Sequence, residues 1–131
     1  MATVDDAISW SDVLEPEAME RDISPFLDSV TTEGEGVIIH SYIRRNYDLE
    51  GTKWEQDVSL NGETLRYDCA DENFIYEFKT KRVLNEDFLP ENDHVEQLEN
   101  YLEATDTGLG FLVYISREDF EVKEYPIVKT P

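Results

Sequence analysis

Two acidic residues and a lysine lie close together on neighbouring segments that both have the pattern of β-strands. In the second segment, NFIYEFK, apolar and polar residues alternate, so that Glu77 and Lys79 point to the same side. A two-residue hairpin loop at residues 72–73 places Asp68 of the preceding strand opposite Glu77. Two carboxylates facing each other across a sheet repel, and a hard divalent cation such as Mg²⁺ between them removes that cost. Metal-bound carboxylates beside an ammonium group are suited to phosphodiester hydrolysis.

This arrangement resembles the signature of the PD-(D/E)XK nuclease superfamily. In that superfamily one strand carries an acidic residue and the next strand carries an acidic-x-Lys triplet. Asp68 is similar to the first position, and Glu77-Phe78-Lys79 is similar to the triplet.

Two more motifs resemble one branch of that superfamily, the RecB-like branch that includes CRISPR-adaptation exonucleases. This branch has a Gln-x-x-x-Tyr motif on the helix after the triplet, which is similar to Gln97 and Tyr101 in HVEQLENYL. It also has a histidine on an earlier helix, often as Gly-x-x-x-His, which is similar to Gly36 and His40 in GVIIH. The matched positions span residues 36–101, about half the chain, in the order of the family.

A second Glu-x-Lys triplet, Glu121-Val122-Lys123, shows how weak one triplet is. It has no strand-borne aspartate opposite it and no following helix with glutamine and tyrosine. We therefore interpret it as a solvated strand edge. The resemblance rests on the ordered combination of motifs.

The resemblance implies an α/β fold with a restriction-endonuclease-like core, in which helices flank a central mixed β-sheet made of an antiparallel meander plus a buried parallel strand. The residue pattern agrees with this. The strands KWEQDVSL, ETLRYDCA and NFIYEFK follow one another, with the hairpin signal Asn61-Gly62 between the first two. The apolar run GLGFLVYIS predicts a strand that is buried on both faces. Residues 1–131 are predicted to form a single domain of this nuclease-like type.

Several details of that fold follow from periodicity. Helices are predicted at about residues 35–47 and 91–104, with short helical pieces at 11–21 and 24–30 that pack over the sheet. Alternation along ETLRYDCA places Tyr67 and Cys69 on one face of the sheet, away from Asp68.

The resemblance also implies a metal site. One Mg²⁺ or Mn²⁺ would be held by His40, Asp68, Glu77 and the backbone carbonyl of Phe78. The ion would polarise the scissile phosphate and lower the pKa of a bound water molecule.

The remaining matched residues would act around that ion. Lys79 would orient the attacking water or neutralise charge in the transition state, and Gln97 and Tyr101 would position Lys79 or the DNA strand. His94, which lies one helical turn before Gln97, is a supporting candidate. The catalytic set is therefore predicted to be Asp68, Glu77, Lys79, Gln97 and Tyr101.

Candidate contacts to nucleic acid are few. Arg44 and Arg45 form the most basic spot of the chain, and they either contact phosphate or pair with nearby acids; both alternatives stay open. Gln97 and Tyr101 are the other candidates, because Tyr101 can stack on an unpaired base.

The net charge of −20, from 31 acidic and 11 basic residues, is unusual for a protein that binds DNA, since affinity for DNA comes largely from neutralised phosphates. An acid-rich, lysine-poor composition resembles that of proteins from halophilic archaea. At about 1 M salt the Debye length is about 3 Å, so long-range repulsion from DNA is removed. We therefore predict an origin in a halophilic archaeon or its virus, with an acidic interaction protein or DNA mimic as the alternative.

Cysteine content and hydropathy exclude other classes. Some small relatives hold an iron–sulfur cluster on four cysteines, and Cys69 is the one cysteine of this chain, so no iron–sulfur cluster is expected. No apolar run approaches the roughly 20 residues that span a membrane, and the N-terminus lacks the pattern of a secretory signal. We expect no membrane association and a reducing cytoplasm.

These observations predict a metal-dependent deoxyribonuclease that hydrolyses phosphodiester bonds in DNA repair, recombination or processing. The preference for an exonuclease rests on the branch resemblance, which also implies DNA as substrate and either a homo-oligomer or a helicase or recombination protein as partner. Two alternatives remain: a structure-selective endonuclease of the junction-resolvase type, and a catalytically inactive acidic module that keeps the fold and binds DNA or protein.

Overall fold

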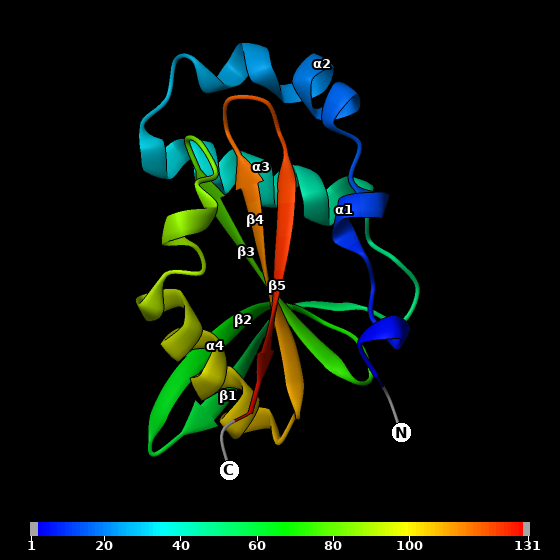
Figure 1. Cartoon of the computed structure of the whole chain (residues 1–131), viewed down its shortest axis with the longest axis vertical. Helices are drawn as coiled ribbons and strands as arrows, with labels where there is room; N and C mark the ends of the chain where they lie inside the picture. The colour runs from blue at the N-terminus through cyan, green and yellow to red at the C-terminus, as the bar shows by residue number, and fades with distance from the viewer. Residues whose placement is uncertain (1–2, 130–131) are drawn as a thin grey trace.

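A five-stranded mixed sheet lies between two layers of helices in the computed structural model, which describes residues 3–129 (Figure 1). β3 and β4 pair in parallel, and the other neighbours are antiparallel. The sheet order is β1 (Lys53–Leu60), β2 (Glu63–Ala70), β3 (Phe74–Lys81), β4 (Leu109–Ser116) and β5 (Val122–Val128). The predicted fold class, a meander plus a buried parallel strand flanked by helices, is confirmed.

The helices divide between the two faces of the sheet. The first face is covered by α1 (Trp10–Val13), α2 (Pro16–Leu27) and α3 (Thr32–Asn46), and the second face by α4 (Asn92–Thr105). Two short 3₁₀ turns are η1 (Val4–Asp6) and η2 (Glu86–Phe88). Within residues 3–129, no helix has both the length and the apolar character needed to cross a membrane.

The core on the α1–α3 face fixes which way β3 points. Phe78 of β3 is 1% exposed, stacks on Trp54 at 5.7 Å, and meets Trp10 edge-on at 4.9 Å. Aromatic contacts of this kind are specific in geometry as well as favourable. Because neighbouring strand residues point to opposite faces, Glu77 and Lys79 must face α4.

The hairpin between β1 and β2 confirms the turn predicted from Asn61-Gly62. Asn61 and Gly62 both have a positive φ, 51° and 84° respectively, as a two-residue turn between twisted strands requires. Leu60 then pairs with Glu63, and the ladder continues to Lys53 and Ala70.

The backbone of β1 is irregular at one position of this ladder. Glu55 has a φ of 51°, and pairing is present at Trp54–Cys69 and Gln56–Tyr67 on either side of it. Opposite this position on β2, Tyr67 packs in the cluster on the α4 face while Cys69 packs in the cluster on the α1–α3 face. The prediction that Tyr67 and Cys69 share a face is therefore wrong, because it assumes a regular ladder.

Two helix predictions also need correction. α3 begins at Thr32, three residues earlier than predicted, because the Thr31 side chain accepts a hydrogen bond from the Gly34 amide at 3.1 Å and caps the helix. The two short pieces predicted at residues 11–21 and 24–30 are instead α1 and a continuous α2 that contains Pro25 in its last turn. Both helices pack over the sheet as predicted.

α4 approaches β4 closely at a glycine. A methyl group added to Gly110 would lie 3.0 Å from the Ile75 carbonyl oxygen, 3.0 Å from Leu98 Cδ1 and 3.1 Å from Leu102 Cδ2. Leu98 and Leu102 are fully buried, so they have little room to move away. This contact sets the distance between α4 and the strands that carry the candidate site.

We expect Gly110→Ala to destabilise the fold by about 1–3 kcal/mol through overpacking. The matched control is Gly36→Ala in α3, where an added methyl group meets nothing within 4 Å; that change should be neutral or stabilising by up to about 1 kcal/mol. Thermal unfolding monitored by circular dichroism checks both. Equal melting temperatures would contradict the close contact of α4 with β4.

Candidate active site

Asp68 and Glu77 face each other where β2 and β3 separate. The predicted register is present at Ala70–Ile75 and Cys69–Tyr76. At the next position the backbone ladder is replaced by two side-chain bonds. Asp68 Oδ2 accepts from the Phe78 amide at 2.8 Å, and Glu77 Oε1 accepts from the Asp68 amide at 2.7 Å. Each carboxylate thus binds the backbone of the opposite strand, an arrangement that we call the carboxylate clasp.

The turn before this point fixes the register. Asp71 accepts bonds from the amides of Asn73 and Phe74 through Oδ1, and its own amide donates to the Phe74 carbonyl. Its Oδ2 also accepts from the Tyr76 hydroxyl at 2.9 Å. An aspartate that closes a turn in this way leaves few alternative registers.

Glu77 is an acid in an unfavourable environment. Its side chain is 2% exposed. Burial, followed by the negative charge of Asp68, raises the pKa of Glu77 well above its ordinary value of 4.5. Among residues 3–129 neither Glu77 nor Asp68 forms an ion pair with a basic side chain. The nearby charge of Lys79 lowers the pKa of Glu77 but only partly offsets these effects. The pair is therefore stabilised by backbone amides and has no direct ion pair with a cation.

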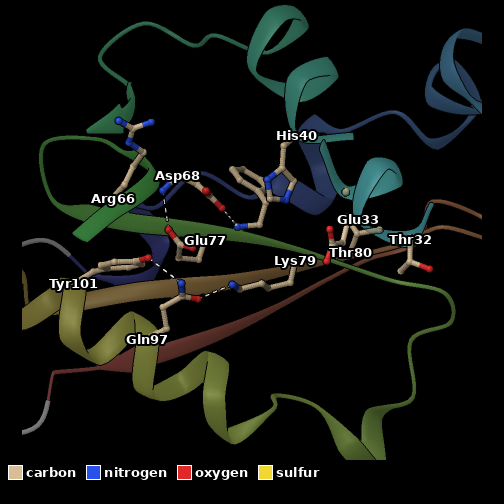
Figure 2. Close-up of a pocket in the computed structure, with 12 residues that line it drawn as sticks. Thr32, Glu33, His40, Arg66, Asp68, Glu77, Lys79, Thr80, Gln97 and Tyr101 are labelled. Atoms are coloured by element: carbon tan, nitrogen blue, oxygen red, sulfur yellow. Dashed lines mark hydrogen bonds between the residues drawn. The ribbon is translucent and has the colours of Figure 1, made fainter. Parts of the chain in front are cut away.

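Lys79 extends along the cavity beside these carboxylates and is bound by α4 (Figure 2). Its Nζ donates to Gln97 Oε1 at 2.5 Å, and Gln97 Nε2 donates to the Tyr101 hydroxyl at 2.9 Å. Burial raises the pKa of Tyr101 to about 12, with the charges of Glu77 and Asp68 adding to the effect. The Tyr101 hydroxyl therefore keeps its proton at neutral pH and can donate it in a hydrogen bond.

One cavity of about 250 Å³ contains all of these side chains, and we call it the catalytic cavity. His40 of α3 lines it from the first face of the sheet, whereas Gln97 and Tyr101 line it from the second. Both faces reach the same space because β2 and β3 separate after Cys69–Tyr76. The cavity is lined by Thr32, Glu33, Gly36, His40, Arg66, Asp68, Glu77, Phe78, Lys79, Thr80, Gln97 and Tyr101.

The donor groups suit a hard divalent cation. Two adjacent carboxylates, an imidazole and the Phe78 backbone are ligand types that Mg²⁺ and Mn²⁺ accept, and the unpaired charge of the clasp would be relieved by a cation. Within residues 3–129, no three His, Cys, Asp or Glu side chains are already arranged to hold a metal ion. His40, Asp68 and Glu77 thus share one cavity without forming a closed ligand set.

The basic candidates lie outside this cavity. Arg44 lines a small adjoining hollow with His40 and Asp68, and its Nη1 pairs with Glu55 Oε2 at 2.5 Å. Both partners are exposed, so this pair is weak and readily exchanged for another anion. Arg45 is exposed and has no ion pair in the described part of the chain.

His94 is not brought into the cavity. Its Nδ1 lies 2.8 Å from the Tyr114 hydroxyl. Burial, followed by the positive charge of Lys79, lowers the pKa of His94. The structure thus gives His94 a packing position on α4 beside the site rather than within it.

The sequence motifs missed four residues that line the cavity: Thr32, Glu33, Arg66 and Thr80. Arg66 lies two residues before Asp68 on the same strand, a spacing that was available as a signal. Its Nε pairs with Asp57 at 2.9 Å, with both side chains more than half exposed. Thr32 and Glu33 lie about two helical turns before His40. The predicted helix began at about residue 35, so it did not include these two residues.

Two residues with no predicted role in catalysis are Cys69 and Lys123. Cys69 is buried among apolar residues, and burial raises the pKa of its thiol. Lys123, of the second Glu-x-Lys triplet, pairs with Glu86 at 2.5 Å on the edge strand β5. Neither residue lines the catalytic cavity.

Comparisons with known proteins bear on the fold. No protein-family model and no curated protein matches the sequence. Among solved structures, the chain is similar to SSO0001, with a TM-score of 0.56 and 23% identity over 88% of this chain and 62% of that one. It is also similar to the alkaline exonuclease LHK-Exo from Laribacter hongkongensis, with a TM-score of 0.56 and 14% identity over 76% of this chain and 56% of that one.

The chain shares its fold with a nuclease. The likeness agrees with the predicted restriction-endonuclease-like fold. The chain spans about three fifths of the length of these two structures. At identities of 23% and 14% the shared property is the fold.

We expect Glu77→Gln to raise the free energy of unfolding at neutral pH when metal is chelated. The pKa of Glu77 is higher in the folded than in the unfolded protein. Stability from this group is therefore fully present below the unfolded pKa and is lost as pH rises through the folded pKa. The difference between wild type and variant should be small near pH 4.5 and grow as pH rises.

Urea denaturation at a series of pH values in EDTA measures this difference. Glu103→Gln, at an exposed position of α4, is the matched control and should shift stability little at every pH. A variant Glu77→Gln that is less stable than wild type at neutral pH would contradict the unfavourable burial of the Glu77 charge.

Proposed function

We propose that this chain is a metal-dependent DNA nuclease that hydrolyses phosphodiester bonds at the catalytic cavity, and that it acts as an exonuclease in DNA repair, recombination or processing. The observation that carries the proposal is the carboxylate clasp, in which the buried Glu77 and the partly buried Asp68 have no basic ion-pair partner among residues 3–129, beside a lysine held by the Gln97 amide. A pair of this kind favours a divalent cation, and phosphodiester hydrolysis is a reaction that a cation and an ammonium group both assist.

His40, Asp68, Glu77 and the Phe78 carbonyl would hold Mg²⁺ or Mn²⁺. When bound, such an ion polarises a phosphate oxygen and lowers the pKa of water. No iron–sulfur cluster enters this proposal.

Three other residues of the cavity, Gln97, Lys79 and Tyr101, would position and stabilise the reacting groups. Gln97 accepts from Lys79 and donates to Tyr101, so its amide fixes the position of the ammonium group in the cavity. Lys79 would place the attacking water or neutralise charge as the phosphate reacts. Tyr101, which keeps its proton, would donate to a phosphate oxygen or stack on an unpaired base.

The acidic composition sets the conditions under which DNA would bind. With a net charge of −20, long-range repulsion from DNA is strong at low ionic strength and short-ranged in molar salt. We therefore infer that the protein works at high salt, as a protein of a halophilic archaeon or its virus does. Arg44 and Arg45 would contact phosphate, because the Arg44–Glu55 pair is exposed.

The setting of the enzyme is part of the same proposal. We infer that the protein is cytoplasmic and binds DNA. We also infer that it works either as a homo-oligomer or with a helicase or recombination protein. The structural similarity to an alkaline exonuclease favours an exonuclease over an endonuclease. The alternatives are a structure-selective endonuclease and an inactive acidic module that binds DNA or protein.

We expect end-labelled linear DNA to be degraded, and a closed circle to stay intact, in molar KCl with Mn²⁺. Lys79→Ala should lower the rate by about 100- to 10,000-fold, because the ammonium group acts at the reacting phosphate. Lys123→Ala removes the same charge from the other Glu-x-Lys triplet, where Lys123 pairs with Glu86, and should leave the rate unchanged. Gel analysis of both substrates provides the measurement.

Each contrary result selects an alternative. Cutting of the closed circle would identify an endonuclease. Equal rates for Lys79→Ala and wild type would show that another site performs the hydrolysis. Absence of cleavage in wild type with Mn²⁺ would favour the inactive binding module.

A further inference from the structure

A second cavity continues from the catalytic cavity. It has a volume of about 360 Å³, and Thr32 and Thr80 line both cavities. These two residues lie at the end of the catalytic cavity that is opposite to Arg66 and Tyr101 (Figure 2). We call the second cavity the side groove; it lies between the ends of α2 and β3 and the β4–β5 turn.

The side groove differs in charge from the rest of the molecule. Three basic residues (Lys81, Arg82 and Arg117) and three acidic residues (Asp28, Glu35 and Glu118) line it, so its wall is neutral in a chain of net charge −20. A neutral surface next to the catalytic cavity is where a polyanion meets least repulsion.

The basic residues of the groove are not equivalent. Arg117 forms ion pairs with Glu35 and with Asp28, and the distance to Asp28 Oδ1 is 2.7 Å. Lys81 Nζ forms an ion pair with Glu91 Oε2 at 2.6 Å. Arg82 has no ion pair in the described part of the chain.

The backbone at Arg82 is held in place even though its guanidinium has no partner. Its carbonyl accepts from the Ser116 hydroxyl and from the Glu118 amide, both at 3.2 Å. An exposed guanidinium on a fixed backbone can offer two donors to a phosphate.

The rest of the lining suits a nucleotide as well. Val30 is 38% exposed and provides an apolar side chain, with the buried Leu27 behind it. At the junction with the catalytic cavity, Thr80 Oγ1 is buried and has no hydrogen-bond partner among residues 3–129. The exposed Val30 matches the base or sugar of a nucleotide, and the Arg82 guanidinium without an ion pair matches its phosphate.

We propose that the side groove binds the DNA strand next to the scissile phosphate, with Arg82 contacting the adjacent phosphate and Val30 packing on its nucleoside. This inference rests on the proposed function. The catalytic cavity lies on the other side of Thr32 and Thr80, and it would bind the adjoining part of the same DNA strand. The groove would thus align the strand along β3, from Arg66 at one end to Arg82 at the other.

Binding of a fluorescein-labelled oligothymidylate of about ten nucleotides tests the groove. Fluorescence anisotropy would be followed over a range of KCl concentrations, with Ca²⁺ in place of Mn²⁺ to limit hydrolysis. Arg82→Ala should weaken binding about tenfold, as expected for loss of one charged hydrogen-bond donor. It should also lower the slope of log affinity against log salt by about 0.7, the contribution of one phosphate on a single strand.

The matched control is Arg21→Ala, which removes the same charge from a side chain that is 73% exposed and lines neither cavity. It should change neither the affinity nor the slope. Val30→Trp, which fills the groove without changing charge, should also weaken binding. Melting temperatures of all variants establish that they are folded.

The outcomes separate this inference from the proposed function. Equal affinities and slopes for Arg82→Ala and Arg21→Ala would overturn the inference, even if wild type degrades DNA. Selective weakening by Arg82→Ala in a protein that cleaves nothing would support the groove as a DNA-binding site while removing the nuclease proposal. Absence of oligonucleotide binding by wild type would overturn the inference.

Discussion

The carboxylate of Glu77 is buried at the candidate site, and the elements around it are arranged to hold it there. A charged group that is 2% exposed is costly, and it persists here because the fold supplies specific compensation. The Asp68 amide donates to it, Asp68 in turn binds the Phe78 amide, and β4 pairs with β3 along its whole length. The compensation is incomplete, since no basic side chain of the described residues pairs with the clasp.

The two helical layers act on opposite sides of that strand. On one side Phe78 packs between Trp54 and Trp10, which prevents β3 from rotating. On the other side α4 lies close to β4 at Gly110 and presents Gln97 to Lys79. Lys79 is therefore held beside the clasp rather than paired with it. This leaves the carboxylates free for a cation, and it ties the position of the ammonium group to the packing of α4.

Local signals in the sequence predicted most of the sheet. Asn61-Gly62 fixed one hairpin, and the apolar run of β4 indicated the buried parallel strand. The residues of the candidate site were predicted through a family resemblance, and the structure brings His40, Glu77 and Gln97 to one cavity.

The remaining features depend on tertiary structure. Tyr67 and Cys69 pack in different clusters opposite an irregular position at Glu55, and a positive φ at a glutamate has no sequence signal. Thr80 and Arg82 line the side groove because three segments that are distant in the sequence come together there: the ends of α2 and β3, and the β4–β5 turn. Periodicity along one element cannot predict such a meeting.

Binding of a divalent cation by the clasp underlies the proposed hydrolysis. Electron paramagnetic resonance of Mn²⁺ in molar KCl measures this binding, because high salt suppresses binding to the acidic surface. We expect one tight Mn²⁺ site per chain in wild type, lost in Glu77→Gln and kept in Glu103→Gln. Tight binding that is the same in all three proteins, or absent from wild type, would show that the clasp is not a metal site.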